Sequence, residues 1–225
     1  MTRPAASSDP SPRVPDGRLL LFSDVDSTLI RDETIDLIAD EAGCGAEVAA
    51  VTERAMQGEL DFTASLTARV GLLAGLEATA LDRVAERYEL TAGAAALMAR
   101  LSEAGHVTGI VSGGFTFLTD RLQRELGITH AFANTLEIVD GRLTGRVSGP
   151  VVDRERKAAL LREIAVAEQI PTERTIAVGD GANDAAMVVA AGLGVAFCAK
   201  PALAEVADLV IDEPDLSLLL PYLGL

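Results

Sequence analysis

Short apolar runs and helical patterns alternate along most of the chain. Residues 19–22 form an apolar run bounded by polar residues, which is typical of a buried strand. Comparable runs lie at residues 107–111, 175–178, 193–197 and 209–211, and helical patterns separate them. Strands that alternate with helices favour a parallel sheet covered by helices on both faces. We therefore predict an α/β protein with a Rossmann-like, doubly wound parallel sheet.

A long helical segment follows the first predicted strand. Residues 32–90 have helical patterns almost throughout, and no strand pattern interrupts them. Asp61 is a suitable N-cap for one of these helices and Thr79 for another. We predict that this segment forms a helical cap, inserted into a core made of residues 18–31 and 91–225.

Two other segments have patterns of their own. Residues 136–144 contain two alternating runs joined by an Asp-Gly pair, which is typical of a β-hairpin. Residues 1–17 are rich in Pro, Ser and Ala and lack apolar periodicity, so we predict a disordered tail there.

Polar clusters follow three of the predicted strands. They occupy residues 24–28, which begin Asp-Val-Asp, residues 112–114, which are Ser-Gly-Gly, and residues 179–184, which include three polar side chains. A single Asp-x-Asp is weak evidence, because a loop carboxylate often caps the next helix. Ligands of open parallel sheets bind beyond the carboxyl ends of the strands, however, and all three clusters should lie at that edge. We therefore predict the functional site there.

The predicted site is rich in carboxylates, which would repel one another without a cation. Asp24, Asp26, Asp180 and Asp184 supply hard oxygen ligands, and no His or Cys stands beside them. Such ligands favour Mg²⁺ over zinc. Because Mg²⁺ takes phosphate oxygens as further ligands, the pattern indicates phosphoryl chemistry.

Lys157 is a candidate for binding the phosphoryl group. The chain contains only two lysines, Lys157 and Lys200, among 19 basic residues, so arginine is its usual surface cation. A lysine at the start of the helix after the hairpin could serve through its compact charge. The alternative is an ordinary surface lysine.

Net charge narrows the possible partners. The chain carries 34 acidic and 19 basic residues, for a net charge of −15. This balance argues against binding nucleic acid or an anionic membrane surface, because nothing would neutralise their phosphates. A small anionic substrate needs only a local positive site and stays compatible with the composition.

The two cysteines, Cys44 and Cys198, are too few for a zinc cluster or a disulfide framework. We interpret them as free thiols in a reducing compartment. No secretory segment opens the sequence, and the apolar runs are too short to span a bilayer. A cytoplasmic protein is expected.

These motifs together resemble the haloacid dehalogenase superfamily. Residues 24–29 (Asp-Val-Asp-Ser-Thr-Leu), residues 112–114, Lys157 and residues 179–184 are similar to its four motifs, in order. The longer string over residues 24–36 resembles the phosphoserine phosphatase branch in particular. Further similarities to that branch lie at Ala55-Met56, Phe62, Leu66, Arg69-Val70 and residues 133–137.

The resemblance implies a phosphoric monoester hydrolase that acts on phosphoserine with Mg²⁺ in serine biosynthesis. It implies Asp24 as the nucleophile that forms an aspartyl-phosphate, and Asp26 as the acid–base. It implies that Mg²⁺ is held by Asp24, the backbone carbonyl of Asp26 and Asp180, with Asp184 orienting this set.

For the substrate, the resemblance implies that Ser112, Gly113, Lys157 and Asn183 bind the phosphoryl group. Glu33 and Arg69 would take the ammonium and the carboxylate. Each of these two has another interpretation. Glu33 fits the first turn of a helix through its dipole, and Arg69, beside an apolar stripe, could simply extend to solvent. His106 and His130 fit no catalytic arrangement, and Met56 and Phe62 are expected in the core unless they line the pocket.

Other functions are compatible with the same motifs. A phosphotransferase, or a phosphatase for another small phosphate ester, would carry the same core motifs. A non-catalytic binding protein would lack the nucleophile or a metal ligand, and a dinucleotide-binding module needs a G-x-G-x-x-G turn that is absent after the first strand. No N-terminal regulatory domain is expected, and the assembly is expected to be a monomer or a homodimer.

Overall fold

The computed structural model describes residues 13–225 of the chain. Its strands are β1 (Leu20–Ser23), β2 (Val107–Phe115), β3 (His130–Val139), β4 (Arg142–Ser148), β5 (Thr175–Gly179), β6 (Leu193–Phe197) and β7 (Leu209–Ile211). Its α-helices are α1 (Thr34–Ala42), α2 (Gly45–Met56), α3 (Phe62–Gly71), α4 (Thr79–Val84), α5 (Ala94–Glu103), α6 (Thr116–Leu126), α7 (Arg154–Ala167), α8 (Ala185–Ala190), α9 (Pro201–Ala204) and α10 (Leu220–Leu223). Most of the predicted disordered tail, residues 1–12, lies outside the described residues. At the start of the described part, the backbone N–H of Arg13 donates to the carbonyl of Tyr222.

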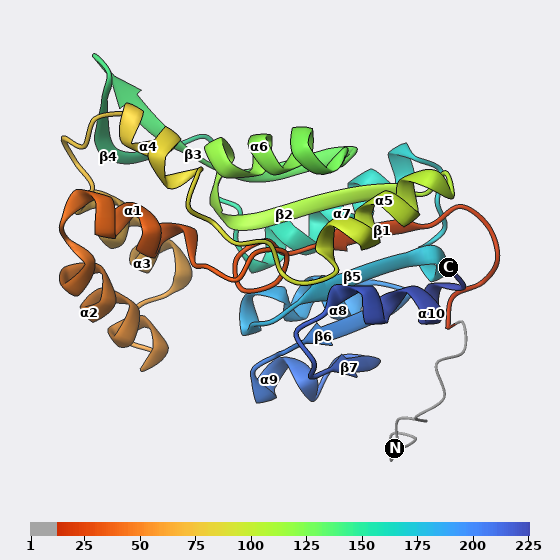
Figure 1. Ribbon diagram of the computed structural model, residues 1–225. Coiled ribbons are helices and arrows are strands. Elements are labelled where there is room, and N and C mark those ends of the chain that lie inside the picture. Colours follow the sequence, from red (N-terminus) through yellow and green to blue (C-terminus); the bar gives the residue numbers. More distant parts are fainter. Residues whose placement is uncertain (1–12) are drawn as a thin grey trace.

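All seven strands belong to one sheet in the order β4-β3-β2-β1-β5-β6-β7. Neighbouring strands run parallel except β4, which is antiparallel to β3. The chain starts at the central strand and extends the sheet in both directions, which places helices on both faces (Figure 1). The predicted α/β fold with a doubly wound sheet is confirmed.

Alternation along β1 explains why both faces are covered. Leu21 belongs to one apolar cluster, with residues of α5 and α6, whereas Leu20 and Phe22 belong to another, with residues of α7 and α8. Successive side chains of a strand point to opposite faces, so a run without polar residues requires a core on each side.

The β3–β4 hairpin has the predicted turn. Asp140 and Gly141 have φ values of 50° and 73°, which suits a two-residue hairpin turn and explains the Asp-Gly pair. The tip also pairs with the chain between α3 and α4: Gly75 N donates to Leu143 O at 2.8 Å, and Leu143 N donates to Leu76 O at 2.9 Å. The hairpin is thereby tied to the helical segment.

Helices α1 to α4 lie at the end of the sheet where the parallel strands finish (Figure 1). The side chain of Asp61 accepts from Ala64 N at 2.7 Å, which confirms the predicted cap. Thr79 is the first residue of α4 and Ala78 holds the capping position, so the cap predicted at Thr79 is wrong. These helices have their own apolar cluster, which Phe115 of β2 and Leu136 of β3 join.

Strand β2 is longer than the sequence indicated. The prediction ended it at Val111, but the strand continues to Phe115. Its register against β3 shifts between Val111 and Phe115. Residues 112–114 therefore lie in an irregular part of the strand rather than beyond its end. Across residues 13–225, no helix is both long enough and apolar enough to cross a membrane.

Candidate active site

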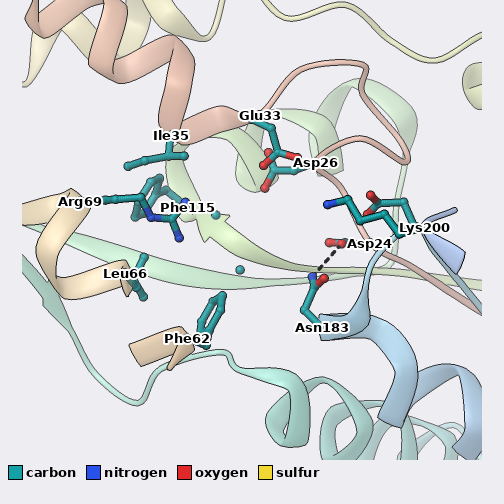
Figure 2. A pocket seen from close by; sticks show the side chains of 13 residues that line it. Asp24, Asp26, Glu33, Ile35, Phe62, Leu66, Arg69, Phe115, Asn183 and Lys200 are labelled. Carbon is teal, nitrogen blue, oxygen red and sulfur yellow. Dashed lines mark hydrogen bonds between the residues drawn. The ribbon is translucent and has the colours of Figure 1, made fainter. Parts of the chain in front are cut away.

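Asp24 stands directly after β1, at the centre of the sheet. Its backbone N–H donates to Val178 O at 2.9 Å, which continues the pairing of β1 with β5. Its carboxylate accepts from Val25 N at 2.7 Å, and the residue is 3% exposed. The sheet therefore fixes one buried carboxylate at the base of a pocket (Figure 2).

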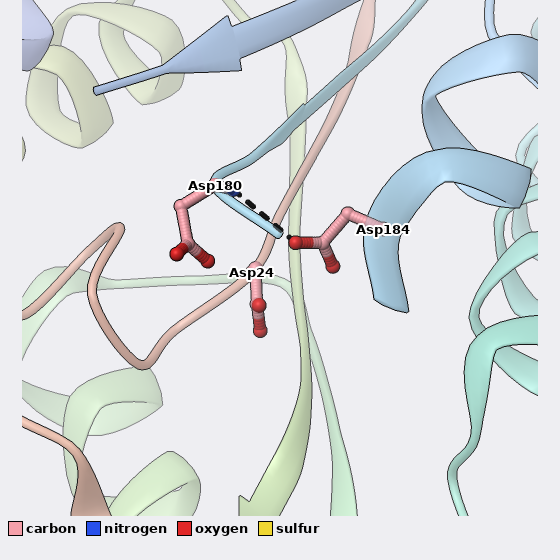
Figure 3. A group of neighbouring side chains, drawn as sticks. All are labelled: Asp24, Asp180 and Asp184. Atoms are coloured by element: carbon pink, nitrogen blue, oxygen red, sulfur yellow. Dashed lines mark hydrogen bonds between the residues drawn. The ribbon is translucent and has the colours of Figure 1, made fainter. Parts of the chain in front are cut away.

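Three carboxylates from two segments, the loop after β1 and the turn after β5, converge here (Figure 3). Oxygen atoms of Asp24, Asp180 and Asp184 lie within 4.8 Å of one another. Asp184 accepts from the backbone N–H groups of Asp180 and Gly181, both at 3.2 Å, so the turn after β5 orients it. An all-oxygen donor set of this kind fits a hard divalent cation.

Lys157 is buried against this cluster. Its ammonium lies 2.8 Å from Asp24 Oδ1 and 2.7 Å from Asp184 Oδ1, and it is 1% exposed. The interpretation as an ordinary surface lysine is therefore wrong. Burial by itself would lower the pKa of Lys157, but the charges of Asp184 and Asp24 outweigh it and raise that pKa above its ordinary value.

One lysine does not balance the charge of the cluster. Burial and the charge of Asp184 hold the pKa of Asp24 well above its ordinary value, although Lys157 opposes them. Burial and Asp184 also raise the pKa of Asp180. These shifts mean that the ionised carboxylates lack part of their counter-charge, which a divalent cation would supply.

Asp26 is held from two sides. Ser112 Oγ donates to its Oδ2 at 2.9 Å, and Thr34 N donates to its Oδ1 at 2.9 Å. The Thr34 hydroxyl donates to the same Oδ1. Since Thr34 begins α1, the Asp26 carboxylate is hydrogen-bonded to both β2 and the first helix of residues 32–90.

The Ser112 hydroxyl is hydrogen-bonded to Asp26 in this structure. Ser112 is 1% exposed, and its hydroxyl accepts from Gly114 N at 2.7 Å while donating to Asp26. The implied contact of this hydroxyl with a phosphoryl group stays a prediction, and it requires the hydroxyl to leave Asp26.

The two glycines after Ser112 line the pocket with backbone. A Cβ on Gly114 would lie 2.7 Å from Asp26 Oδ2, and one on Gly113 would lie 2.9 Å from the ring of Phe62. Both distances are too short for a side chain, which explains the Gly-Gly pair. Asn183 reaches the same place, where its Nδ2 donates to Asp24 Oδ2 at 3.4 Å.

The pocket has a volume of about 200 Å³, which suits a ligand smaller than most drug-sized molecules. Figure 2 shows Arg69 and Leu66 on one side, Asp24, Asn183 and Lys200 on the other, and Glu33 beside Asp26. The full lining is Asp24, Asp26, Glu33, Ile35, Phe62, Leu66, Arg69, Gly113, Gly114, Phe115, Asp180, Asn183 and Lys200. The structure thus brings the predicted residues together around one cavity, with Ser112, Lys157 and Asp184 buried behind it.

Glu33 and Arg69 are the charged pocket residues that the segment of residues 32–90 supplies. Glu33 accepts from Ser27 Oγ at 2.7 Å, and Arg69 Nε donates to Ser65 O at 3.4 Å. Among residues 13–225, neither forms an ion pair. A zwitterion in the pocket would find both charges unpaired.

The protein environment shifts the pKa of both groups. Glu33 is exposed, yet the desolvation around its carboxylate and the charge of Asp26 raise its pKa to about 7. Burial lowers the pKa of Arg69, and the charge of Glu33 opposes that effect. A bound ammonium beside Glu33 would favour the ionised carboxylate.

Sequence reasoning missed four residues of the site, including the apolar lining residues Ile35 and Phe115, and misplaced one. It gave no role to Thr34 or to Lys200. Nothing in the local sequence marks Thr34 as a site residue, whereas the rarity of lysine in this chain could have pointed to Lys200. Met56 is 75% exposed and does not line this pocket, so neither position expected for it is right. His106 and His130 lie away from the pocket: His106 accepts from Leu19 N, and His130 contacts Glu168.

Known proteins resemble the chain over most of its length. Residues 21–188 match the family of haloacid dehalogenase-like hydrolases. The phosphoserine phosphatase of Streptomyces coelicolor is 56% identical over 206 residues, which are 92% of this chain and 50% of the relative. That of Methanocaldococcus jannaschii is 46% identical over 206 residues, which are 92% of this chain and 97% of the relative.

Solved structures agree with these relatives. A substrate-bound phosphoserine phosphatase complex superimposes with a TM-score of 0.87 and 44% identity, covering 92% of this chain and 99% of the other. The chain spans about half the length of the first curated relatives that it matches.

Proposed function

Because this chain belongs to the haloacid dehalogenase-like hydrolase family, we propose that it hydrolyses O-phospho-L-serine to serine and phosphate. One observation carries the proposal: a single small pocket places the buried Asp24 opposite Arg69, with Glu33 nearby and in no ion pair with any residue of 13–225. An amino acid phosphate presents a phosphoryl group, a carboxylate and an ammonium, and these three groups match the three parts of the pocket. Serine biosynthesis in the cytoplasm, as its last step, is the role that we assign to it.

Asp24 is the proposed nucleophile. Val25 N and Lys157 hold its Oδ1, which fixes the orientation of the carboxylate. Attack of the carboxylate on phosphorus forms the Asp24–phosphorus bond as the bond from phosphorus to the seryl oxygen breaks. Asp26 gives a proton to the departing oxygen, then takes one from the water that hydrolyses the aspartyl-phosphate. Serine and phosphate are the products.

Mg²⁺ is the proposed cofactor. Asp24, Asp180 and the backbone carbonyl of Asp26 would hold it, and Asp184 would orient this set through its contacts with the turn after β5. When bound, the ion offsets the charge of the carboxylates and polarises the phosphoryl group. The raised pKa values of Asp24 and Asp180 support a cation in this position.

Gly113, Asn183 and Lys157 are the proposed phosphoryl ligands, with Ser112 joining them if its hydroxyl turns from Asp26. Arg69 is the proposed partner of the substrate carboxylate, since a planar guanidinium suits bidentate binding. Glu33 is the proposed partner of the ammonium. We also propose that residues 32–90 act as a cap on the core of residues 18–31 and 91–225. The residue before α1 and helix α3 supply these two charged groups, and the same segment forms part of the pocket wall.

Activity is expected to require Mg²⁺ and to fall when Ca²⁺ is in excess. Calcium accepts more ligands with looser geometry, so it could bind both oxygens of Asp24 and block the attack. Phosphate release should be measured after chelation, after Mg²⁺ is restored, and in a Ca²⁺ titration at fixed Mg²⁺. Full activity after exhaustive chelation would contradict the assignment of the metal.

Arg69→Ala is expected to lower kcat/KM for phosphoserine by about 30-fold to several thousand-fold, because losing a buried charge partner costs roughly 2–5 kcal/mol. A phosphate ester without a carboxylate should lose much less. Arg54→Ala is the matched control, since Arg54 lies in α2 and forms an exposed ion pair with Glu59. Equal losses on both kinds of substrate would make Arg69 a structural residue.

One assay separates hydrolysis from transfer of the phosphoryl group to an alcohol. Phosphate release from phosphoserine should be followed with and without an acceptor alcohol such as glycerol. Hydrolysis to water predicts that phosphate and serine form in equal amounts in both cases. Formation of a new phosphate ester, with phosphate falling below serine, would indicate a phosphotransferase instead.

A further inference from the structure

Asn134 is a buried polar residue outside the pocket lining. It lies in β3, opposite Phe115 of β2, and is 2% exposed. Its Nδ2 donates to Gly113 O at 2.8 Å, and its Oδ1 accepts from Val152 N at 2.9 Å. A buried amide is costly unless both of its ends are bonded. Here both ends bind backbone, and the two partners come from different segments.

The first partner belongs to the irregular part of β2. The register of β2 against β3 shifts between Val111 and Phe115, so regular pairing does not set the backbone at residues 112–114. The peptide between Gly113 and Gly114 is instead fixed by side chains. Asn134 binds its carbonyl, and Ser112 Oγ accepts from its N–H at 2.7 Å. This peptide faces the pocket.

The second partner precedes α7. Val152 is followed by Asp153, whose side chain caps the helix by accepting from Arg156 N at 2.8 Å. Lys157 directly follows Arg156, and its ammonium contacts Asp24 and Asp184. A bond to Val152 N therefore fixes the chain immediately before the turn that carries the buried lysine.

We propose that Asn134 is a positioning residue for the phosphoryl site. One amide holds the Gly113 backbone and the start of α7 at a fixed separation, so that Gly113 and Lys157 act on the same phosphoryl group. This inference rests on the proposed function, because it takes that group as the ligand. Asn134 itself does not touch the ligand.

The test uses Asn134→Asp in the full chain. The carboxylate can still accept from Val152 N, but it cannot donate to Gly113 O and repels that carbonyl. Asn134→Ser is the second variant, since a short hydroxyl is uncharged and cannot reach both partners. Thr175→Val is the matched control: Thr175 is 1% exposed and its hydroxyl also makes two bonds to backbone, to Thr172 O and from Gly192 N, at the amino end of β5.

Two readouts decide the role of Asn134. Inorganic phosphate is titrated calorimetrically into the protein with Mg²⁺ present, and kcat and KM are measured for phosphoserine. Both Asn134 variants should bind phosphate about 10- to 100-fold more weakly and lose kcat by a similar factor, since small displacements of catalytic groups have effects of that size. Thr175→Val should lower Tm comparably and leave both readouts near those of the wild type.

Three outcomes would overturn the proposal. Phosphate affinity and kcat could stay unchanged in the Asn134 variants, they could fall equally in Thr175→Val, or neither Asn134 variant could fold. The last result would make Asn134 a residue of the fold and not of the site. If the wild-type protein fails to hydrolyse phosphoserine, the proposed substrate is wrong, while the phosphate titration still tests Asn134.

Discussion

Asp26→Asn is expected to lower the turnover of phosphoserine by about 10²–10⁴, the usual contribution of general acid–base catalysis. Asparagine cannot donate a proton to a departing serine alkoxide. The structure explains why the variant should keep its fold. The amide oxygen can accept from Thr34, as Oδ1 does now, while the amide NH₂ can donate to the Ser112 hydroxyl. The loss would then reflect chemistry.

Asp26→Asn is expected to behave differently with an aryl phosphate than with phosphoserine, provided that the pocket admits the aryl group. The leaving group of an aryl phosphate needs no acid, so Asp24 can still be phosphorylated. Hydrolysis of the aspartyl-phosphate still needs a base, and the base is gone. A burst of the phenol should precede slow turnover, and the intact protein should gain the mass of one phosphoryl group. Steady turnover of both substrates without that mass gain would remove Asp26 from the acid–base role.

Lys157→Met is expected to destabilise the protein by about 3–5 kcal/mol, the usual cost of removing one partner of a buried ion pair. The ammonium is 1% exposed and meets two buried carboxylates, so methionine would leave both without their nearest counter-charge. Urea unfolding without metal measures the free energy of unfolding directly. Hydrolysis of phosphoserine should also be lost, because the proposed phosphoryl ligand is gone.

Arg156→Ala is the control for that experiment. Arg156 precedes Lys157 in α7, but its ion pair with Glu163 is partly exposed to solvent, and surface pairs contribute about 0–1 kcal/mol. Added Mg²⁺ should restore part of the stability of Lys157→Met, because a cation among the carboxylates replaces some of the lost charge. A loss of stability no larger than that of Arg156→Ala would contradict the buried role of Lys157.

Those features that depend on local pattern could be predicted from the sequence. A run such as residues 19–22, with no polar residue, must be buried on both faces, and the Asp-Gly pair at 140–141 specifies its turn. Asp24 and Asp180 could be placed together because parallel strands end at one edge of a sheet. The separation of these residues in sequence did not matter, since topology alone brings β1 and β5 side by side.

Features that depend on packing between segments could not be predicted in the same way. The extension of β2 past Val111 requires β3 as a neighbour, and Ser-Gly-Gly has no strand preference of its own. The bonds from Thr34 to Asp26 depend on where α1 begins. Met56 looked apolar enough for the core or the pocket, but the end of α2 leaves it exposed. Each of these outcomes depends on how the elements are placed in space, which the local pattern does not specify.

The most direct test of the central claim compares kcat/KM among phosphate esters with Mg²⁺ present. Phosphoserine, phosphoethanolamine, which lacks the carboxylate, and a sugar phosphate should be measured under the same conditions. The pocket formed by Asp24, Glu33 and Arg69 predicts that phosphoserine exceeds both others by about 30-fold or more, the effect of one buried charge partner. Comparable values for all three, or a preference for the sugar phosphate, would contradict the account.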